Sequence, residues 1–76
     1  MERLSKMLDR NVAALCEQER YFTASFIAAR QLLDGAHVGN GGLLFPSGSL
    51  VGPRGCSCGD RACLHQVAWR IYSHAH

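Results

Sequence analysis

Residues 55–65 read Gly-Cys-Ser-Cys-Gly-Asp-Arg-Ala-Cys-Leu-His, and they decide the fold because they concentrate the metal-ligating side chains of a short chain. The spacing is C-x-C-x4-C-x-H. A structural zinc ion takes four ligands in tetrahedral geometry, drawn from cysteine sulfur and histidine nitrogen. Glycines at 55 and 59 permit a tight turn that brings the first two sulfurs to one metal. The pattern predicts zinc as the cofactor, held by Cys56, Cys58, Cys63 and His65.

Other interpretations of these cysteines have less support. A disulfide between Cys56 and Cys58 would close a strained small ring. The N-terminal residues Met-Glu-Arg-Leu-Ser-Lys contain no signal-peptide core, and no apolar run is long enough to span a membrane. A cytoplasmic protein with reduced thiols is therefore expected. An iron–sulfur cluster stays open, although histidine is a minority ligand of such clusters.

The two ligand pairs, Cys56-Ser57-Cys58 and Cys63-Leu64-His65, resemble the signature of the SWIM-type zinc finger. That signature is C-x-C, a variable spacer, then C-x-H. The resemblance covers about residues 42–73, and residues 1–41 resemble no known family. It implies short strands before the first cysteine, a helix after the histidine, and a non-catalytic module. SWIM fingers occur in transposases, helicase-like ATPases, recombination accessory proteins and ubiquitin-ligase-like proteins, where they are thought to bind DNA or other proteins.

The chain has 76 residues, which is enough for one domain. Because so small a domain buries only about 60% of the surface that its unfolded chain exposes, a metal, a disulfide or a partner is expected to stabilise it. Residues 2–34 contain neither glycine nor proline, whereas residues 35–55 contain seven of the eight glycines and both prolines. We therefore expect a helical segment at 1–34 and a SWIM-like zinc finger at 35–76, in a single compact unit.

The first segment predicts a helix, because its apolar residues recur at the spacing of one helix face. They are Leu4, Leu8, Val12, Leu15, Phe22, Phe26, Ala29 and Leu33. One unbroken helix would be about 45–50 Å long, more than the rest of the chain can cover. Either the helix breaks near residues 17–20 into a hairpin, or the stripe pairs with a second chain in a homodimer. We favour the second interpretation slightly, although such a stripe is most often simply core.

The remainder of the chain predicts a β-hairpin and a final helix. Apolar residues at 43–45 and 50–51 flank the turn-forming residues 46–49, and a flexible glycine-rich segment at 39–42 leads into them. A helical stripe follows, with Cys63 at its entrance, where the helix dipole favours a thiolate. The stripe consists of Leu64, Val67, Ala68, Ile71 and Tyr72. The fold class is therefore α+β: a small zinc-stabilised domain.

Charge and motifs leave two functions open. The net charge is +2, and there is no polybasic arm of the kind that dedicated DNA-binding proteins carry. Since paired carboxylates and phosphate-binding loops are absent too, we do not expect an enzyme. The first function is a protein-interaction adaptor or regulator. The alternative is a nucleic-acid-binding accessory protein that uses Arg54, Arg61 and Arg70.

Trp69 allows two interpretations. It lies opposite Val67 and Ala68 on the final helix. We favour packing of its indole against the N-terminal helix. Otherwise it forms a contact patch for a base or a partner with the neighbouring arginines. Three other side chains are expected to have plain roles: Cys16 as a small apolar residue, His37 as a solvated turn residue and His74 as part of the tail.

Overall fold

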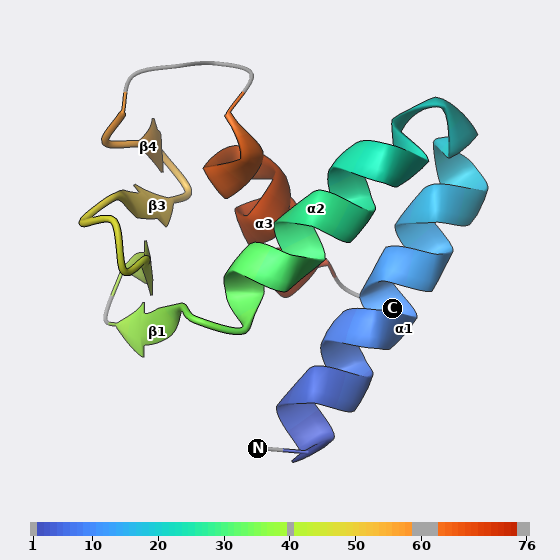
Figure 1. The fold of residues 1–76 in the computed structure, drawn as a ribbon, viewed down its shortest axis with the longest axis horizontal. Coiled ribbons are helices and arrows are strands. Elements are labelled where there is room, and N and C mark those ends of the chain that lie inside the picture. The colour runs from blue at the N-terminus through green and yellow to red at the C-terminus, as the bar shows by residue number, and fades with distance from the viewer. Residues whose placement is uncertain (1, 40, 59–62, 75–76) are drawn as a thin grey trace.

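Two helices at the N-terminus fold back on each other in the computed structural model, which describes residues 2–39, 41–58 and 63–74 (Figure 1). Helix α1 (Glu2–Gln18) is followed by the short 3-10 helix η1 (Arg20–Phe22) and by helix α2 (Thr23–Leu33). Four short strands come next: β1 (His37–Gly39), β2 (Gly42–Leu44), β3 (Leu50–Gly52) and β4 (Gly55–Cys56). Helix α3 (Leu64–Ser73) follows the cysteines. The predicted α+β fold class is confirmed.

Of the two interpretations of the N-terminal stripe, the break near residues 17–20 into a helical hairpin is confirmed, and the unbroken helix implied by the one that we favoured slightly is not observed. The last helical hydrogen bond of α1 runs from the Glu19 amide to the Leu15 carbonyl at 2.8 Å, and Glu19 then leaves helical geometry at φ −132° and ψ 67°. The physical reason is burial. Folding back at the polar residues 17–20 lets Leu8 and Leu15 share a core with α2, so the stripe needs no second chain to cover it. The homodimer itself stays a prediction.

An arginine fastens the two helices together on their outer side. The Nε of Arg30 on α2 lies 2.9 Å from a carboxylate oxygen of Asp9, and its NH2 group donates to the Ser5 hydroxyl at 2.8 Å. Arg30 also pairs with Asp34 one turn later at 2.6 Å. These contacts set how α1 and α2 lie against each other at the surface.

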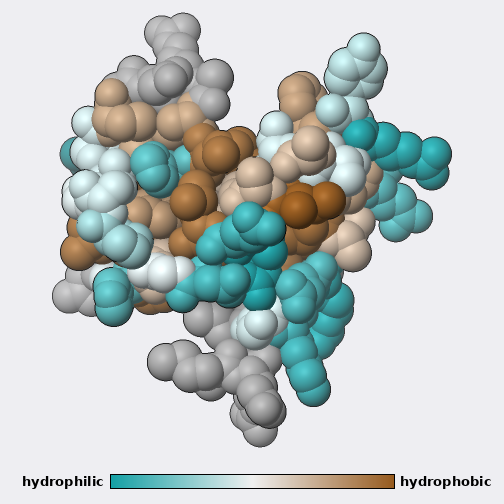
Figure 2. Space-filling model, in the orientation of Figure 1, coloured by the Kyte–Doolittle hydropathy of each residue, from teal (hydrophilic) through white to brown (hydrophobic). Residues whose placement is uncertain are grey.

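Helix α3 crosses both helices and completes the core. Asn11 of α1 is fully buried, and its amide donates to the Ile71 carbonyl at 2.8 Å. The buried apolar residues come from the helices and the sheet alike: Leu8, Leu15, Phe26, Ala29, Leu33, Leu43, Phe45, Val51, Ala68 and Ile71. Figure 2 shows apolar residues, in brown, gathered near the middle of one face, with polar residues around them. One hydrophobic core therefore unites the N-terminal helical segment with the sheet and α3.

The strands form an antiparallel meander in the order β1-β2-β3-β4. The predicted hairpin is confirmed as β2 and β3, with Leu43 opposite Val51 and Leu44 opposite Leu50. Strands β1 and β4 were not predicted, because two or three residues are too few to show a period of two. His37 consequently lies in a strand rather than in the turn we expected, although its side chain is exposed as predicted. Gly39 and Gly42, at the two ends of the glycine-rich segment that leads into the hairpin, belong to β1 and β2 and are register partners.

Candidate metal centre

Four donor atoms converge where the sheet meets the start of α3. One donor atom from each predicted ligand lies within 4.8 Å of all the others: Cys56, Cys58, Cys63 and His65. Cys56 ends strand β4 and Cys58 lies in the turn after it, whereas Cys63 is the N-cap of α3 and His65 lies in its first turn. The site therefore joins the last strand to the last helix. The residues between the two pairs, 59–62, lie outside the described part of the chain, and so does the predicted glycine flank at 59.

The separation of two donors can be compared with zinc geometry. The Cys56 Sγ atom lies 3.6 Å from the His65 Nδ1 atom. Tetrahedral zinc, with a Zn–S bond of about 2.3 Å and a Zn–N bond of about 2.0–2.1 Å, separates a sulfur from a nitrogen by about 3.6 Å. The donor set is also the soft, sulfur-rich set that zinc takes in structural sites. The residues present therefore fit a zinc ion, with a nitrogen and three sulfurs as its ligands.

The backbone around Cys56 is shaped by its neighbours. Gly55 has φ +124°, a conformation that residues with a side chain rarely adopt, as its place beside the C-x-C pair predicted. Ser57 is tied to strand β3 by two hydrogen bonds. Its amide donates to the Leu50 carbonyl at 2.8 Å, and its hydroxyl accepts from the Leu50 amide at 2.9 Å. Two thiols thus project from a turn whose middle residue is fastened to the sheet.

The imidazole of His65 is placed by an aromatic neighbour. Phe45, which directly follows β2, is buried, and its ring centroid lies 4.6 Å from that of His65 at an interplanar angle of 44°. This contact limits rotation of the imidazole, whose Nδ1 atom faces the Cys56 sulfur. The Phe45 ring therefore holds the His65 imidazole in place, just as the hydrogen bonds of Ser57 hold the turn that carries Cys56 and Cys58.

The thiol of Cys56 is held in its protonated form by its surroundings. Burial raises its pKa to about 11, a hydrogen bond from the Cys58 backbone opposes the rise, and the neighbouring thiols of Cys58 and Cys63 add to it. In the metal-free chain this thiol therefore keeps its proton at neutral pH, and a bound metal must displace it. Cys63 has the extended backbone of an N-cap, at φ −72° and ψ 149°, so the positive end of the α3 dipole lies beside its sulfur.

The other predicted site residues do not gather at this centre. Trp69 is half-buried, packs against the hydrophobic core, and lines a groove at the sheet with Tyr72, Pro53 and Arg54. The packing of its indole against the N-terminal helix, which we favoured, stays a prediction. Arg54 is exposed between β3 and β4, and Arg61 lies outside the described residues.

Arg70 is engaged within the chain. Both terminal nitrogens of its guanidinium donate to the two carboxylate oxygens of Glu19, NH1 at 3.2 Å, and the guanidinium also lies over the Phe26 ring, 5.7 Å from its centroid. It is consequently not the free cation that the nucleic-acid interpretation assumed.

Two residues that position the site were not identified from the sequence. The side chain of Ser57 could have been suspected, since serine often bonds to nearby backbone in turns. No local signal marks Phe45 as a neighbour of His65, because the two are 20 positions apart in the chain and meet only through tertiary packing.

Comparison with known proteins identifies no relative: no protein-family model, no curated protein and no solved structure matches this chain. Within the described residues, no helix has both the length and the apolar character required to cross a lipid bilayer. The SWIM-type assignment therefore stays a prediction, and the function has to be argued from the site.

Proposed function

We propose that this chain is a non-catalytic zinc-binding module of the SWIM type, which acts as an adaptor or regulator by binding another protein. The observation that carries the proposal is the convergence of three thiols and one imidazole within 4.8 Å. A zinc ion with four protein ligands has no open position for substrate or water, so its role is structural. The order of hairpin, C-x-C, C-x-H and helix supports the SWIM type.

Two observations favour a protein partner over nucleic acid. The carboxylate of Glu19 compensates the charge of Arg70, and the net charge of the whole chain is only +2. Nucleic-acid binding draws most of its affinity from neutralised phosphates, which requires several free cations on one face. Several large apolar side chains, in contrast, are about half exposed, including Val38 at 55% and Leu50 at 52%. Exposed apolar surface of this kind suits a protein partner.

The zinc assignment is tested by removing one ligand. The chain offers a matched control, because Cys16 is a fourth, partly buried cysteine on α1, outside the cluster. We expect one zinc ion per chain in the purified protein, and the same content in Cys16→Ala. Cys58→Ala should lose most of its zinc, or bind it at least about tenfold more weakly. Elemental analysis of the three proteins measures this. Equal zinc content in the Cys58 and Cys16 variants would overturn the assignment.

A further inference from the structure

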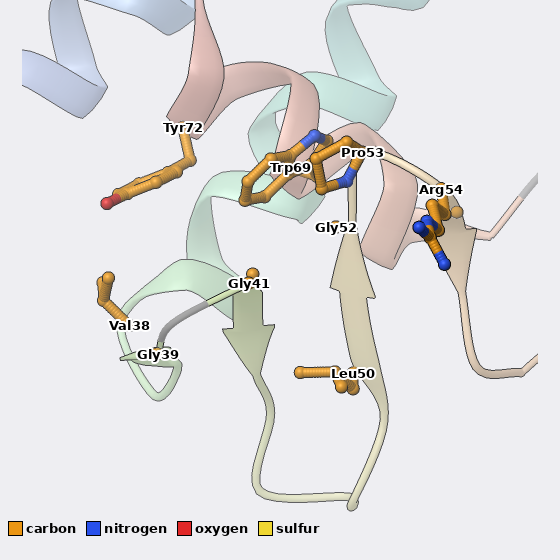
Figure 3. Close-up of a pocket in the computed structure, with 11 residues that line it drawn as sticks. Val38, Gly39, Gly41, Leu50, Gly52, Pro53, Arg54, Trp69 and Tyr72 are labelled. Atoms are coloured by element: carbon orange, nitrogen blue, oxygen red, sulfur yellow. The ribbon is translucent and has the colours of Figure 1, made fainter.

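A groove of about 620 Å³ lies between α3 and the sheet, outside the metal centre (Figure 3). Trp69 and Tyr72 project from α3 on one side, with ring centroids 5.7 Å apart. Val38 of β1 and Leu50 of β3 lie across from them, and both are more than half exposed. The groove is thus lined by two half-buried aromatic rings at the margin of the hydrophobic core and by two exposed aliphatic side chains.

A row of glycines keeps this groove open. Gly39 pairs with Gly42, and Gly52 pairs with Gly55, so glycine occurs on all four strands at this end of the sheet. Strands β2 and β3 approach so closely that a Cβ atom on Gly42 would clash with the Val51 carbonyl. A Cβ atom on Gly41, in contrast, would meet nothing within 4 Å. Backbone without side chains therefore forms one wall, where larger residues would fill the space.

The charge around the groove has one sign. Arg54 is the one ionisable residue besides Tyr72 that lines it, and it makes no ion pair with any described residue. A second cavity of about 440 Å³ adjoins it, sharing Pro53, Arg54 and Trp69, and adds Arg70. Neither cavity is lined by a described aspartate or glutamate. Since Glu19 compensates Arg70, Arg54 is the charge that a ligand would have to match.

We propose that this groove binds a short acidic peptide segment of a partner protein, with one bulky apolar side chain against Trp69 and Tyr72 and an adjacent carboxylate at Arg54. The inference rests on the proposed role in protein interaction and gives the chemistry of the partner. Aromatic anchors beside a complementary charge are the usual centre of such contacts.

A single nucleic-acid strand would also use aromatic rings and arginines, but the groove suits it less well. Bases stacking on aromatic rings need a track of cations for successive phosphates. Among the described residues, Arg54 is the one arginine that lines the groove, and the aliphatic side chains of Val38 and Leu50 would find little apolar surface on a sugar-phosphate backbone. The peptide is therefore the ligand that accounts for all four apolar side chains.

The test uses the fluorescence of Trp69, which is the sole tryptophan of the chain and lies in the groove. Zinc-loaded protein is titrated with capped peptides of the form Gly-Asp-X-Glu-Gly, where X is Phe, Tyr, Leu or Met. Comparison probes are the same peptides with both acids replaced by lysine, Gly-Asp-Gly-Glu-Gly, and an eight-residue oligothymidylate. We expect saturable binding of acidic peptides with an apolar X, and binding about tenfold weaker or absent for the comparison probes.

Two groove variants and two matched controls locate the binding. Arg54→Glu should bind the acidic peptides about tenfold more weakly and the lysine peptides more tightly than the unaltered chain does. Gly41→Leu should weaken the binding of both acidic and lysine peptides, because the added side chain would occupy space that is open beside Gly41. Arg10→Glu repeats the charge reversal at an exposed position on α1, and Gln31→Leu places a leucine at an exposed position on α2; both should bind as the unaltered chain does.

The outcomes separate the two proposals. If purified protein carries no zinc, the proposed zinc module is wrong, whatever the peptides do. If the zinc-loaded chain responds to none of the acidic peptides, or binds oligothymidylate more tightly than all of them, the groove assignment alone is wrong. Equal binding by Arg54→Glu and Arg10→Glu would likewise overturn it.

Discussion

Ser57 holds the middle of the C-x-C pair without offering a ligand of its own. Its two hydrogen bonds to Leu50, at 2.8 and 2.9 Å, fasten the turn between Cys56 and Cys58 to strand β3. Groups that orient metal ligands contribute to affinity because they reduce the ordering that the metal would otherwise have to impose. The site therefore includes two residues besides its four donors: Ser57, and Phe45, whose ring packs on the His65 imidazole.

Replacing Ser57 separates this orienting role from ligation. We expect Ser57→Ala to weaken zinc binding by about tenfold, because the hydroxyl bond to the Leu50 amide is lost. Ser57→Thr keeps the hydroxyl and should restore most of the affinity. Competition with a chromophoric chelator measures both variants. Ser47→Ala, in the exposed β2–β3 turn, is the control, and equal affinity in Ser57→Ala and Ser47→Ala would contradict the orienting role.

At the scale of elements, an ion pair connects the end of α1 to helix α3. Glu19 lies at the break between α1 and η1, and Arg70 lies in the last turns of α3. Hydrogen bonding to the Arg70 guanidinium holds the pKa of the Glu19 carboxyl below its ordinary value of 4.5, while burial opposes the shift. The pair thus links the helical break, which the N-terminal pattern left open, to the helix that carries His65.

The pH dependence of this pair has a definite sign. Because the pKa of Glu19 is lower in the folded chain than in the unfolded chain, its stabilisation is complete above pH 4.5 and is lost as the pH falls through the lowered value. We expect Glu19→Gln to lower the melting temperature slightly at pH 7, with the difference from the unaltered chain narrowing once the pH falls below 4.5. Exposed pairs contribute little, so the effect is small.

The control for Glu19 is Glu17→Gln, which changes an exposed carboxylate two residues earlier. Melting temperatures of the three proteins are compared at each pH, so that loss of zinc in acid affects all of them alike. If the Glu17 and Glu19 variants differ from the unaltered chain equally at pH 7, the ion pair with Arg70 has no effect on stability.

At the scale of the whole molecule, one core spans both segments of the chain. Residues of α1 and α2, such as Leu15 and Phe26, share it with Leu43 and Val51 of the sheet and with Ile71 of α3. The metal centre lies at the edge of this core, since Val51 is the register partner of Cys56. Loss of a bound metal would therefore act on α1 and α2 as well as on the sheet and α3.

Removing zinc should accordingly unfold the whole chain. Structural zinc binding contributes about 10–16 kcal/mol near neutral pH, which is comparable to or larger than the stability of most small domains. We expect an excess of chelator to abolish the cooperative thermal transition and most of the helical circular dichroism, and added zinc to restore both. Unchanged dichroism after zinc has been removed would contradict this expectation.

The assembly state follows from where the apolar stripe is buried. Its members Leu8, Leu15, Phe26, Ala29 and Leu33 are buried within the chain. Because they are no longer free to meet a second chain, we expect sedimentation at micromolar concentration to give a monomer. A dimer that persists in a variant with Leu8→Ser would have to use another surface. A dimer that Leu8→Ser dissociates, without loss of helical circular dichroism, would revive the pairing of stripes.

Three features could be predicted from the sequence: the identity of the four donors, the helical stripes and the β2–β3 hairpin. Each depends on residues close together in the chain. Cys56 and His65 are nine positions apart, and the periods of helix and strand are visible over one or two turns. These features can be inferred without knowing the fold, because local backbone geometry alone decides which side chains share a face.

Only the tertiary structure decided what covers the apolar stripe and where several polar groups find partners. The break at Glu19 depends on burial of the stripe in the core that α1 shares with α2, and the Arg70 that pairs with Glu19 lies 51 positions away. Strands β1 and β4 exist because β2 and β3 supply their hydrogen bonds. The groove beside Trp69 arises because four strands bring their glycines to one end of the sheet. These features result from contacts between distant segments, whose free energy is gained only when the whole core forms.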